Sequence, residues 1–501
     1  MKTRNLFLSL FAFAALCACN KETDPVGPEV LEKDAYIAVS IVAPTDVASR
    51  AGTTGTDGNY YDPGTDAEKS VSSALFLFYK EDGTFDQLAK PTLKYNAQDT
   101  DNPYKEVVTE ATIVLKAQTL APKSLLVVLN PPTGLETEAS TLSLTEMKEK
   151  FADYAASAPT SFIMTNSNYD KANGKCEVSC EGKIYADAAS AIGDPVTVNV
   201  ERVVSKVIVT DAAWKFKDGE NVVTTVNVNF NSDVDANGNG SLDDKVIKQV
   251  KPSILGYKVT NIAEDSYLFK NVTGMTEDWM FDDANMRSYW ATSHASNHED
   301  DFVRYSFDEI EAETNKVFYC NENTDATTHS QLIVAVKFVD ESDVEIGTFY
   351  KYQGEYYTEE GVKAIAVKLL KDNGYDYSAL ALTIAASTDK PWKAIVKFAD
   401  ETGKSAEELA VLTGMTDIWA WTNGHAYYFT TVDHFEGKVG MVRNHSYQIN
   451  VQSIKGFGTP VYDDTKVIDP ETPSDAEYLN LAATINILQW KIVKQDVDFG
   501  A

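Results

Sequence analysis

The stretch PVTVNVERVVSKVIV, residues 195–209, is the longest of the strand-like runs in this chain. It consists largely of β-branched residues, and apolar and polar residues alternate over its first half, which is the pattern of a strand. The run is longer than most single strands. Because so long a strand can take part in two sheets, we predict that one domain ends and the next begins inside or just after it.

Other strand-like runs lie on both sides of this stretch, separated by turn sequences such as DGT, NPPTG and DANGNG. They cover residues 35–43, 73–80, 124–130, 222–230, 331–340, 379–385, 393–400 and 445–454. Helical patterns cover only 143–157, 358–374 and 405–412, the first with Thr145 as its expected N-cap. Strands that follow one another with few helices between them favour sandwiches. The predicted fold class is mainly β, with two tandem antiparallel β-sandwich domains of the transthyretin-like or Greek-key kind and a few short helices.

The composition limits the choice of partners. The chain has 501 residues, of which 44% are apolar and 11% aromatic, enough for a large core and two or more domains. Its 44 basic and 75 acidic residues give a formal net charge of −31. The acids are spread along the chain and indicate an acidic solvent-exposed surface, which repels nucleic acids and anionic membranes. We therefore expect no nucleic-acid partner.

The first residues resemble a bacterial lipoprotein signal. Two basic residues precede an apolar run at 6–16 that is too short to span a bilayer, and small residues then precede Cys19. Residues 1–19 are predicted to be a signal peptide, with Cys19 carrying acyl chains that anchor the chain to a membrane. The alternative is an ordinary secretory signal cut after Ala18. No other stretch reaches the roughly 18–20 apolar residues of a membrane helix.

Three cysteines lie beyond the N-terminus, at Cys176, Cys180 and Cys320. An odd number at this low density is not typical of a disulfide scaffold. Cys176 and Cys180 could be bridged across the turn in KCEVSCEG or stay reduced, and both alternatives are open at this point. Because no CxxC occurs, the sequence indicates neither a thiol-redox nor a zinc-ribbon function.

Motifs for catalysis are missing from the sequence. It contains no GxSxG, no GxxxxGK[ST] and no GxGxxG after a strand. His294 and His298 are four residues apart, but the polar residues around them indicate a loop rather than a zinc-binding helix face. We predict that the protein is not an enzyme and needs no catalytic cofactor.

One loop has the spacing of a calcium site. In DVDANGNGSLDD, the residues Asp233, Asp235, Asn237 and Asp244 could supply oxygen ligands. The twelfth position is Asp rather than the longer bidentate Glu, and the flanks are strand-like rather than helical. The alternatives are a bound structural calcium and a solvated acidic hairpin loop. An aromatic stretch at 417–435 likewise has two readings, a glycan-binding platform or buried sheet residues.

The chain ends on a strand-prone segment, AEYLNLAATINILQWKIVKQDVDFGA, residues 476–501. It follows an acidic spacer at 463–475 that is expected to be flexible. The predicted apolar anchors of this strand are Ile485, Ile487, Trp490 and Ile492. The strand could pair within its own domain or with another molecule.

A strand-prone segment also lies near the other end, at 35–43, with apolar residues such as Ala35, Ile37, Val39 and Ile41. A connector at 46–68, rich in Gly, Thr and Asp, follows it and contains Arg50. If this strand were removed, the sheet would be left with unpaired backbone groups beside an apolar trough, which is a template for a foreign strand.

Several stretches together resemble the fimbrillin family, the lipoprotein-derived pilus subunits of Bacteroidales, and most closely the major shaft subunit of short, Mfa-type fimbriae. They are the signal ending at Cys19, ASRAG at 48–52, LLVVLN at 125–130, VTVNVERVVSKVIV at 196–209, MVRNHSYQINVQSIKGFG at 441–458 and ATINILQWKIVKQDVDF at 483–499. The insertions at 231–244 and 285–330 match no part of the family pattern.

The resemblance implies an assembly mechanism. A lipidated precursor reaches the outer membrane, and an arginine-specific surface protease cuts Arg50–Ala51. The strand at 35–43 then leaves its sandwich, and the donor strand of another subunit fills the groove. Repeated head-to-tail, this contact gives a filament rather than a ring. The implied partners are further copies of the chain, fimbrial anchor and tip subunits and the protease, and the implied roles are adhesion and biofilm formation at the cell surface.

These expectations divide the chain into five parts. Residues 1–19 are the signal peptide, 20–50 a propeptide with the displaceable strand, 51–205 and 206–470 the N- and C-terminal sandwiches, and 471–501 the donor segment. Two alternatives to a shaft subunit stand beside this prediction. One is a surface lipoprotein that binds glycans through residues 417–435, and the other is a fimbrial tip or accessory subunit.

Overall fold

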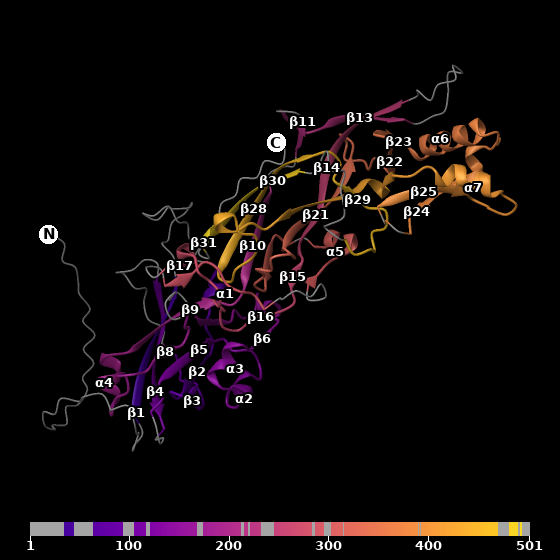
Figure 1. Cartoon of the computed structure of the whole chain (residues 1–501). Coiled ribbons are helices and arrows are strands. Elements are labelled where there is room, and N and C mark those ends of the chain that lie inside the picture. Colours follow the sequence, from indigo (N-terminus) through magenta and orange to yellow (C-terminus); the bar gives the residue numbers. More distant parts are fainter. Residues whose placement is uncertain are drawn as a thin grey trace, which may run out of the picture.

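The structure is a computed structural model of the whole chain, shown in Figure 1. It describes residues 35–44, 64–93, 105–116, 121–167, 174–211, 215–218, 221–231, 245–282, 286–294, 302–313, 315–388, 390, 392–468, 480–488 and 491–492. In this part of the chain the prediction of a mainly β fold with a few short helices is confirmed.

The N-terminal sheet has eight strands. Seven lie in the order β3-β2-β5-β7-β9-β1-β4, and β8 pairs with β5. Their bounds are β1 Ala35–Pro44, β2 Ala74–Tyr79, β3 Phe85–Ala89, β4 Lys105–Leu115, β5 Ser124–Leu129, β7 Met164–Asn166, β8 Val178–Ser179 and β9 Val196–Arg202. The first strand of the chain therefore lies between two others rather than at the end of the sheet.

The C-terminal sheet has seven strands, with β12-β11-β28-β10-β20 in line and β30 and β31 attached to β28. Their bounds are β10 Ser205–Asp211, β11 Phe216–Asp218, β12 Asn221–Val223, β20 Val317–Cys320, β28 His445–Lys455, β30 Asn480–Leu488 and β31 Lys491–Ile492. The strand nearest the C-terminus thus pairs with a strand of its own chain.

A third sheet of ten strands has the order β24-β25-β26-β22-β23-β13-β14-β21-β27-β29. Its bounds are β13 Val226–Asn231, β14 Lys245–Thr260, β21 Gln331–Val339, β22 Phe349–Tyr352, β23 Glu355–Tyr357, β24 Leu382–Ala386, β25 Lys393–Phe398, β26 Ile418–Trp421, β27 His425–Thr431 and β29 Thr459–Pro460. Three two-stranded ladders join β6 Phe151–Ala152 to β16 Ser266–Tyr267, β15 Ile262–Ala263 to β19 Phe302–Val303, and β17 Phe281–Asp282 to β18 Arg287–Ser288.

The helices are short except for one. They are α1 Asp66–Lys69, α2 Leu135–Ala139, α3 Leu144–Lys148, α4 Ala188–Gly193, α5 Phe307–Glu311, α6 Glu359–Asp372 and α7 Ala406–Thr413. The helices expected at 358–374 and 405–412 correspond to α6 and α7. The one expected over 143–157 is wrong in length, because α3 ends at Lys148, and its cap is Ser143 rather than Thr145.

The sheets are not purely antiparallel. Strand β1 runs parallel to β9, β10 runs parallel to β28, and β13 runs parallel to β23. The sequence expectation of antiparallel sandwiches did not include these pairs. Parallel neighbours require a crossover between the paired strands, so strands far apart in sequence become neighbours in each sheet.

The run at 195–209 is divided between two sheets, with β9 in the N-terminal sheet and β10 in the C-terminal sheet. Val203 and Val204 between them are buried in the first core, which also contains the inner faces of β1, β2 and β5. A second core lies between the C-terminal and ten-stranded sheets and includes Val207 and Tyr447.

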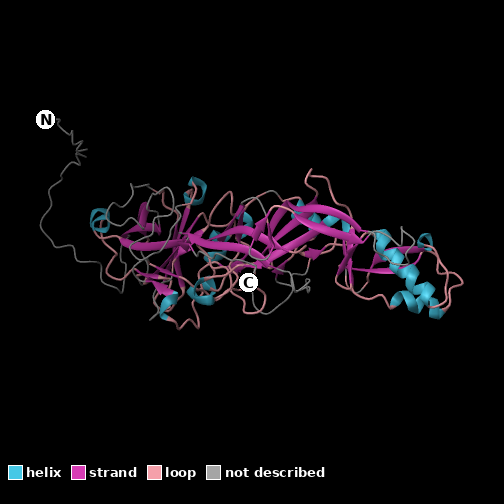
Figure 2. Ribbon diagram, turned by 90° about the horizontal axis from the view of Figure 1, so that it is seen from above, coloured by secondary structure: helices cyan, strands magenta, loops and turns pink. Residues whose placement is uncertain are grey.

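The molecule is elongated, with the N-terminal sheet at one end and α6 and α7 at the other (Figures 1 and 2). Around α6 and α7 a third apolar cluster packs against β24–β26. Strands β28 and β30 lie near the middle of the long axis (Figure 1). In the described residues, no helix has the length and apolarity needed to cross a membrane.

Candidate functional site

Strand β1 forms two ladders within the N-terminal sheet. It pairs antiparallel with β4, from Ala35 opposite Leu115 to Pro44 opposite Lys105, with a bulge between Ile41 and Val42. On its other side it pairs in parallel with β9, from Val39 opposite Val196 to Val42 opposite Asn199. Hydrogen bonds therefore hold β1 along both edges.

Both faces of β1 are also covered. Ala35, Ile37 and Val39 are at most 2% exposed and belong to the first core. On the opposite face Ala38 packs with Tyr185 and with Ala191 of α4. The backbones of Tyr36 and Tyr185 exchange two hydrogen bonds of 2.7 and 2.8 Å. This strand is an integral part of the sheet and not an appended one.

Removal of β1 has a larger consequence than the sequence indicated. A single row of unpaired groups was expected, but β1 is flanked by β9 and β4, so its loss opens two facing edges. The gap is lined on one face by the first core. Burying Ile37 and Val39 stabilises the sheet by about 1.5–3 kcal/mol each, so the gap strongly favours a replacement strand with apolar residues at alternate positions.

The predicted donor strand lies on the C-terminal sheet of its own chain. Strand β30 pairs antiparallel with β28, with Ile485 opposite Ile449 and Ile487 opposite Tyr447, and the register shifts between Val451 and Ser453. Ile492 lies in β31, which pairs with both β28 and β30. Of the two alternatives for this strand, the structure has the pairing within its own molecule.

Strand β30 occupies an outer position. Strand β10 pairs with one edge of β28 and β30 with the other. Within the described residues, β31 is the only other strand that pairs with β30, through Leu488 and Lys491. The β30 ladder can therefore open without separating two other strands of the sheet, in contrast to β1.

Several predicted site residues fall outside the residues that the structure describes. These are the lipidation residue Cys19, the processing residues Arg50 and Ala51, the anchor Trp490 and the calcium candidates Asp233, Asp235, Asn237 and Asp244. For these residues the roles stated in the sequence analysis stay predictions. Among the described residues no group of His, Cys, Asp or Glu could hold a metal ion.

The cysteines are reduced and enclosed. Cys176 and Cys180 lie in the first core and Cys320 in the second, and all three are free thiols. Burial raises the pKa of each thiol to about 12. Of the alternatives for Cys176 and Cys180, the structure has the reduced pair.

The aromatic stretch at 417–435 faces the interior. Trp421 is 1% exposed, stacks on Phe349 at 4.9 Å and donates a hydrogen bond from Nε1 to the Phe457 carbonyl at 2.9 Å. Tyr428 is equally enclosed, and burial raises its pKa well above the ordinary value. Trp421 and Tyr428 are sheet residues of the second core, and Trp419 and Phe435 are partly buried against it, so the structure favours buried sheet residues of the two alternatives for this stretch.

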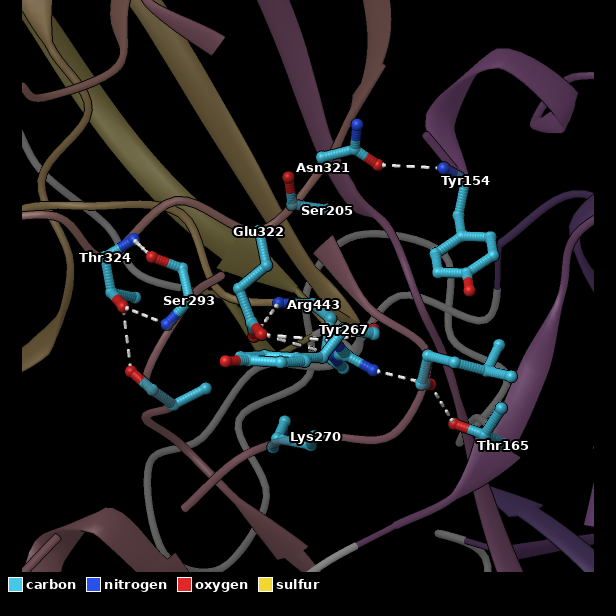
Figure 3. A network of polar contacts seen from close by, with 12 residues as sticks. Tyr154, Thr165, Ser205, Tyr267, Lys270, Ser293, Asn321, Glu322, Thr324 and Arg443 are labelled. Atoms are coloured by element: carbon cyan, nitrogen blue, oxygen red, sulfur yellow. Dashed lines mark hydrogen bonds and ion pairs between the residues drawn. The ribbon is translucent and has the colours of Figure 1, made fainter. Parts of the chain in front are cut away.

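Sequence reasoning missed a buried polar network between the first and second cores. Arg443 lies directly before β28 and pairs with Glu322, and both side chains have no exposed surface. Figure 3 shows Arg443 also reaching the segment that contains Tyr267. Single charges within strand-like runs, such as Glu201 and Arg202 in NVERVV, are the signal that could have indicated it.

A family model matches the C-terminal part of the chain. Residues 419–496 match the model described as "Major fimbrial subunit protein type IV, Fimbrillin, C-terminal". The match covers β27, β28 and β30, and so includes both the tail strand β30 and its partner β28. A comparison with curated proteins found no match.

Solved structures with a similar course of the chain come from Parabacteroides, Bacteroides and Porphyromonas. A proposed cell adhesion protein of Parabacteroides distasonis is 11% identical, with 92% of this chain and 97% of that chain covered and a TM-score of 0.39. A proposed cell adhesion protein of Bacteroides eggerthii is 12% identical, with 93% and 98% covered and a TM-score of 0.37. The tip fimbrial protein Mfa3 of Porphyromonas gingivalis, truncated at its C-terminus, is 9% identical, with 90% and 99% covered and a TM-score of 0.31.

At these TM-scores the structural similarities carry no argument about assembly or binding. The sequence match at 419–496 is independent of them and includes the stretch at 441–458 and most of the stretch at 483–499, on which the resemblance to fimbrillins rests in part. Residues 419–496 therefore match the C-terminal fimbrillin model, and the resemblance to fimbrillins found in the sequence is confirmed over that region.

Proposed function

We propose that the protein is a structural shaft subunit of a cell-surface fimbria that polymerises by strand exchange. It is made as a lipoprotein precursor with Cys19 acylated, reaches the outer membrane, and is cut by an arginine-specific protease at Arg50–Ala51. The fibre then supports adhesion and biofilm formation, together with anchor and tip subunits. No step in this scheme requires catalysis by the chain itself.

The observation that carries the proposal is the position of β1. It is the first strand of the structure, it precedes Arg50 in the sequence, and it lies between β9 and β4 with Ile37 and Val39 in the first core. Cleavage after this strand detaches it from the rest of the chain without breaking any other helix or strand among the residues that the structure describes. A chain without β1 has two open ladders and exposed core residues, which a strand from outside can satisfy.

The tail is suited to be that strand, provided that it first leaves β28. Its ladder with β28 is at the outer edge, so release does not expose another strand of the sheet on both sides. Exchange of one ladder for another leaves the number of backbone hydrogen bonds nearly constant, and the gain comes from burying apolar residues in the groove. The docked tail and the plugged groove together keep the uncut precursor monomeric.

The test is in vitro polymerisation of a precursor that starts at residue 20. Cleavage by an arginine-specific protease is expected to give a ladder of oligomers on a gel and filaments by electron microscopy. The Arg50→Ala variant is the matched control and is expected to stay uncut and monomeric. If the cut wild-type chain stays monomeric at all concentrations, the proposal is wrong.

A tail deletion tests whether residues 476–501 are the strand that a shaft subunit donates. A cut chain without residues 476–501 keeps its groove but has no strand to donate, so it is expected to cap growing filaments of the wild type and shorten them. If added tail-deleted chain leaves the lengths of the filaments unchanged, the donated strand is not this segment and that part of the proposal is wrong.

A further inference from the structure

The groove that β1 fills and the C-terminal tail, residues 476–501, are linked by one continuous series of strands. Strand β9 lies beside β1, and through Val203 and Val204 it leads directly into β10. Strand β10 is parallel to β28, and β28 carries β30. The shortest path along the strands from the groove to the tail therefore runs through the β9–β10 connection.

Charged side chains just before and after this connection are paired inside the protein. Lys270 Nζ donates to Glu201 Oε2 and to the Ser288 carbonyl, both at 2.9 Å, and neither charged side chain is more than 2% exposed. Burial raises the pKa of Glu201 and lowers that of Lys270, so each depends on the other for its charge. Glu201 is in β9 and Lys270 belongs to the loop after β16, so the pair joins a strand of the N-terminal sheet to a loop from the second half of the sequence.

The second group lies around Glu68 in α1. Lys206 of β10 pairs with Glu68 at 2.6 Å, and the Tyr319 hydroxyl of β20 donates to the same carboxylate at 2.7 Å. Arg202 donates to the Glu68 carbonyl at 2.8 Å and to Asn444 Oδ1 at 3.2 Å. Helix α1 is thereby fixed to both β9 and β10.

The third group is centred on Arg443. Its guanidinium donates to the carbonyls of Tyr267 and Leu268 at 2.5 and 3.0 Å and pairs with Glu322 at 3.2 Å, as Figure 3 shows. Leu268 itself is buried in the first core, although it follows β13 and β14 of the ten-stranded sheet in sequence. Arg443 therefore fixes this inserted segment to the start of β28.

Asn321 adds a bridge directly after β20. Its Oδ1 accepts hydrogen bonds from the backbones of Tyr154 and Ala155 at 3.2 and 3.0 Å. Its Nδ2 donates to the carbonyls of Ala263 and Glu264 at 3.2 and 3.0 Å. Four backbone groups from two distant segments thus depend on one amide side chain, which Figure 3 shows beside Tyr154.

We infer that these buried groups form a rigid load-bearing joint that fixes the N-terminal sheet relative to the C-terminal sheet. We call it the polar junction, and it consists of Glu68, Glu201, Arg202, Lys206, Lys270, Asn321, Glu322 and Arg443. An apolar interface alone tolerates sliding, because its attraction has no direction. Buried ion pairs and hydrogen bonds are directional, and separating one leaves a desolvated charge without its partner. Arg443 and Asn321 are positioning residues in this joint.

The consequence for a fibre rests on the proposed function. There the polar junction keeps the angle between the groove and the tail the same in every subunit. Constant angles between successive contacts give a straight or regularly coiled filament. A hinge at the same place would give filaments that bend irregularly.

The experiment uses the uncut chain from residue 20 and its Arg443→Met variant. The wild type is expected to unfold in one thermal transition and to scatter X-rays in solution as a single elongated body. Arg443→Met is expected to unfold in two transitions, to show a broader distribution of maximum dimensions, and to be cut by thermolysin at 203–204 at least about tenfold faster. Lys368→Met, which removes an exposed ion pair on α6, is the matched control and is expected to leave all three readings unchanged.

If Arg443→Met unfolds in one transition and scatters as the wild type does, the inference is wrong. Should this variant fail to fold, Asn321→Ala decides the question, because it removes a neutral group whose charged partner, Asp153, is exposed, and so leaves no buried charge unpaired. It is expected to speed the thermolysin cut and to broaden the scattering in the same direction, and an unchanged result overturns the inference.

A fibre measurement separates this inference from the proposed function. If cut wild type forms filaments, those of Asn321→Ala are expected to have a shorter persistence length by electron microscopy. If cut wild type forms none, the proposed function fails, while the scattering and proteolysis of the monomer still decide whether the junction is rigid.

Discussion

The strands near the two ends of this chain are held in different ways. Strand β1 has a neighbour on each edge and is buried on both faces, whereas β30 pairs with β28 alone over most of its length, within the residues described. Loss of β1 divides a sheet and exposes a core, and loss of β30 only shortens a sheet by its outer strand. The comparison explains why β1 would leave its sheet only after proteolysis, whereas β30 could leave β28 without it.

The largest effect on the free energy of unfolding is expected for a chain that begins at Ala51. Without β1 it loses the burial of Ile37 and Val39, about 3–6 kcal/mol together, in addition to two ladders. Urea denaturation of the first core is expected to show at least this loss of unfolding free energy, and a peptide of residues 35–44 should restore it. Full stability without the peptide would remove the contrast between the two strands.

A large effect is also expected from Glu68→Gln. Burial alone would raise the pKa of Glu68, but the charge of Lys206 and hydrogen bonds from Lys206, Thr65 and Tyr319 hold it below its ordinary value of 4.5. The pair therefore stabilises the fold fully above that value, and its contribution is lost as the pH falls through the lower pKa of the folded state.

At pH 7 the Glu68→Gln variant is expected to lose up to about 3–5 kcal/mol, because Lys206 stays buried without its counter-charge. The difference from wild type should shrink as the pH falls below the ordinary value of 4.5. Denaturation midpoints measured at several pH values check this, and a difference that does not depend on pH would contradict it.

Within β1, Ile37→Ala is expected to cost about 2–5 kcal/mol, because Ile37 is fully enclosed in the first core. Ser40→Ala, at a half-buried polar position of the same strand, should change stability by no more than about 0.5 kcal/mol. Chemical denaturation of both variants is the measurement. Equal effects would mean that the strand is held by its backbone ladders alone.

The buried thiols report which core opens. Cys176 and Cys180 lie in the first core and Cys320 in the second. In the chain that begins at Ala51, a thiol reagent should modify the first two at least about tenfold faster than in the uncut chain, because opening exposes them. Cys320 is the internal control and should react equally slowly in both. Mass spectrometry of the modified peptides distinguishes the three sites.

The smallest effect is expected from deleting residues 476–501. Because β30 is an outer strand, the first core should keep its unfolding free energy to within about 1 kcal/mol. Thermal unfolding of the truncated chain checks this. A loss as large as that caused by removing β1 would show that the two strands are equally integral to the fold.

Local pattern was sufficient for some elements and not for others. Helix α6 has a Thr358 cap, apolar residues at helical spacing and a C-terminal Asn373-Gly374, and it formed as expected. The helix expected over 143–157 stops at Lys148, because Phe151 and Ala152 pair with Tyr267 and Ser266. That partner lies more than a hundred residues away, so no local signal could indicate it.

The polar junction could not be derived from sequence for the same reason. Arg443 and Glu322 are 121 residues apart, and Arg202 and Asn444 are 242 apart. A charged residue in a strand-like run is compatible with an exposed edge or with a buried pair. Only the position of its partner distinguishes the two.

Local sequence patterns located many of the strands, the longer helices and the two strand-prone ends, because alternation and turn residues act over a few neighbouring positions. Strands β4 and β14 lie outside the predicted runs. The match of residues 419–496 to fimbrillin also depends on sequence alone. Only the tertiary structure decided that β1 lies between β9 and β4, that β30 docks on β28, and that charges far apart meet in the interior. The physical reason is that sheet neighbours and the partners of buried charges are chosen by which apolar surfaces can be covered together, a property of the whole chain and not of any segment.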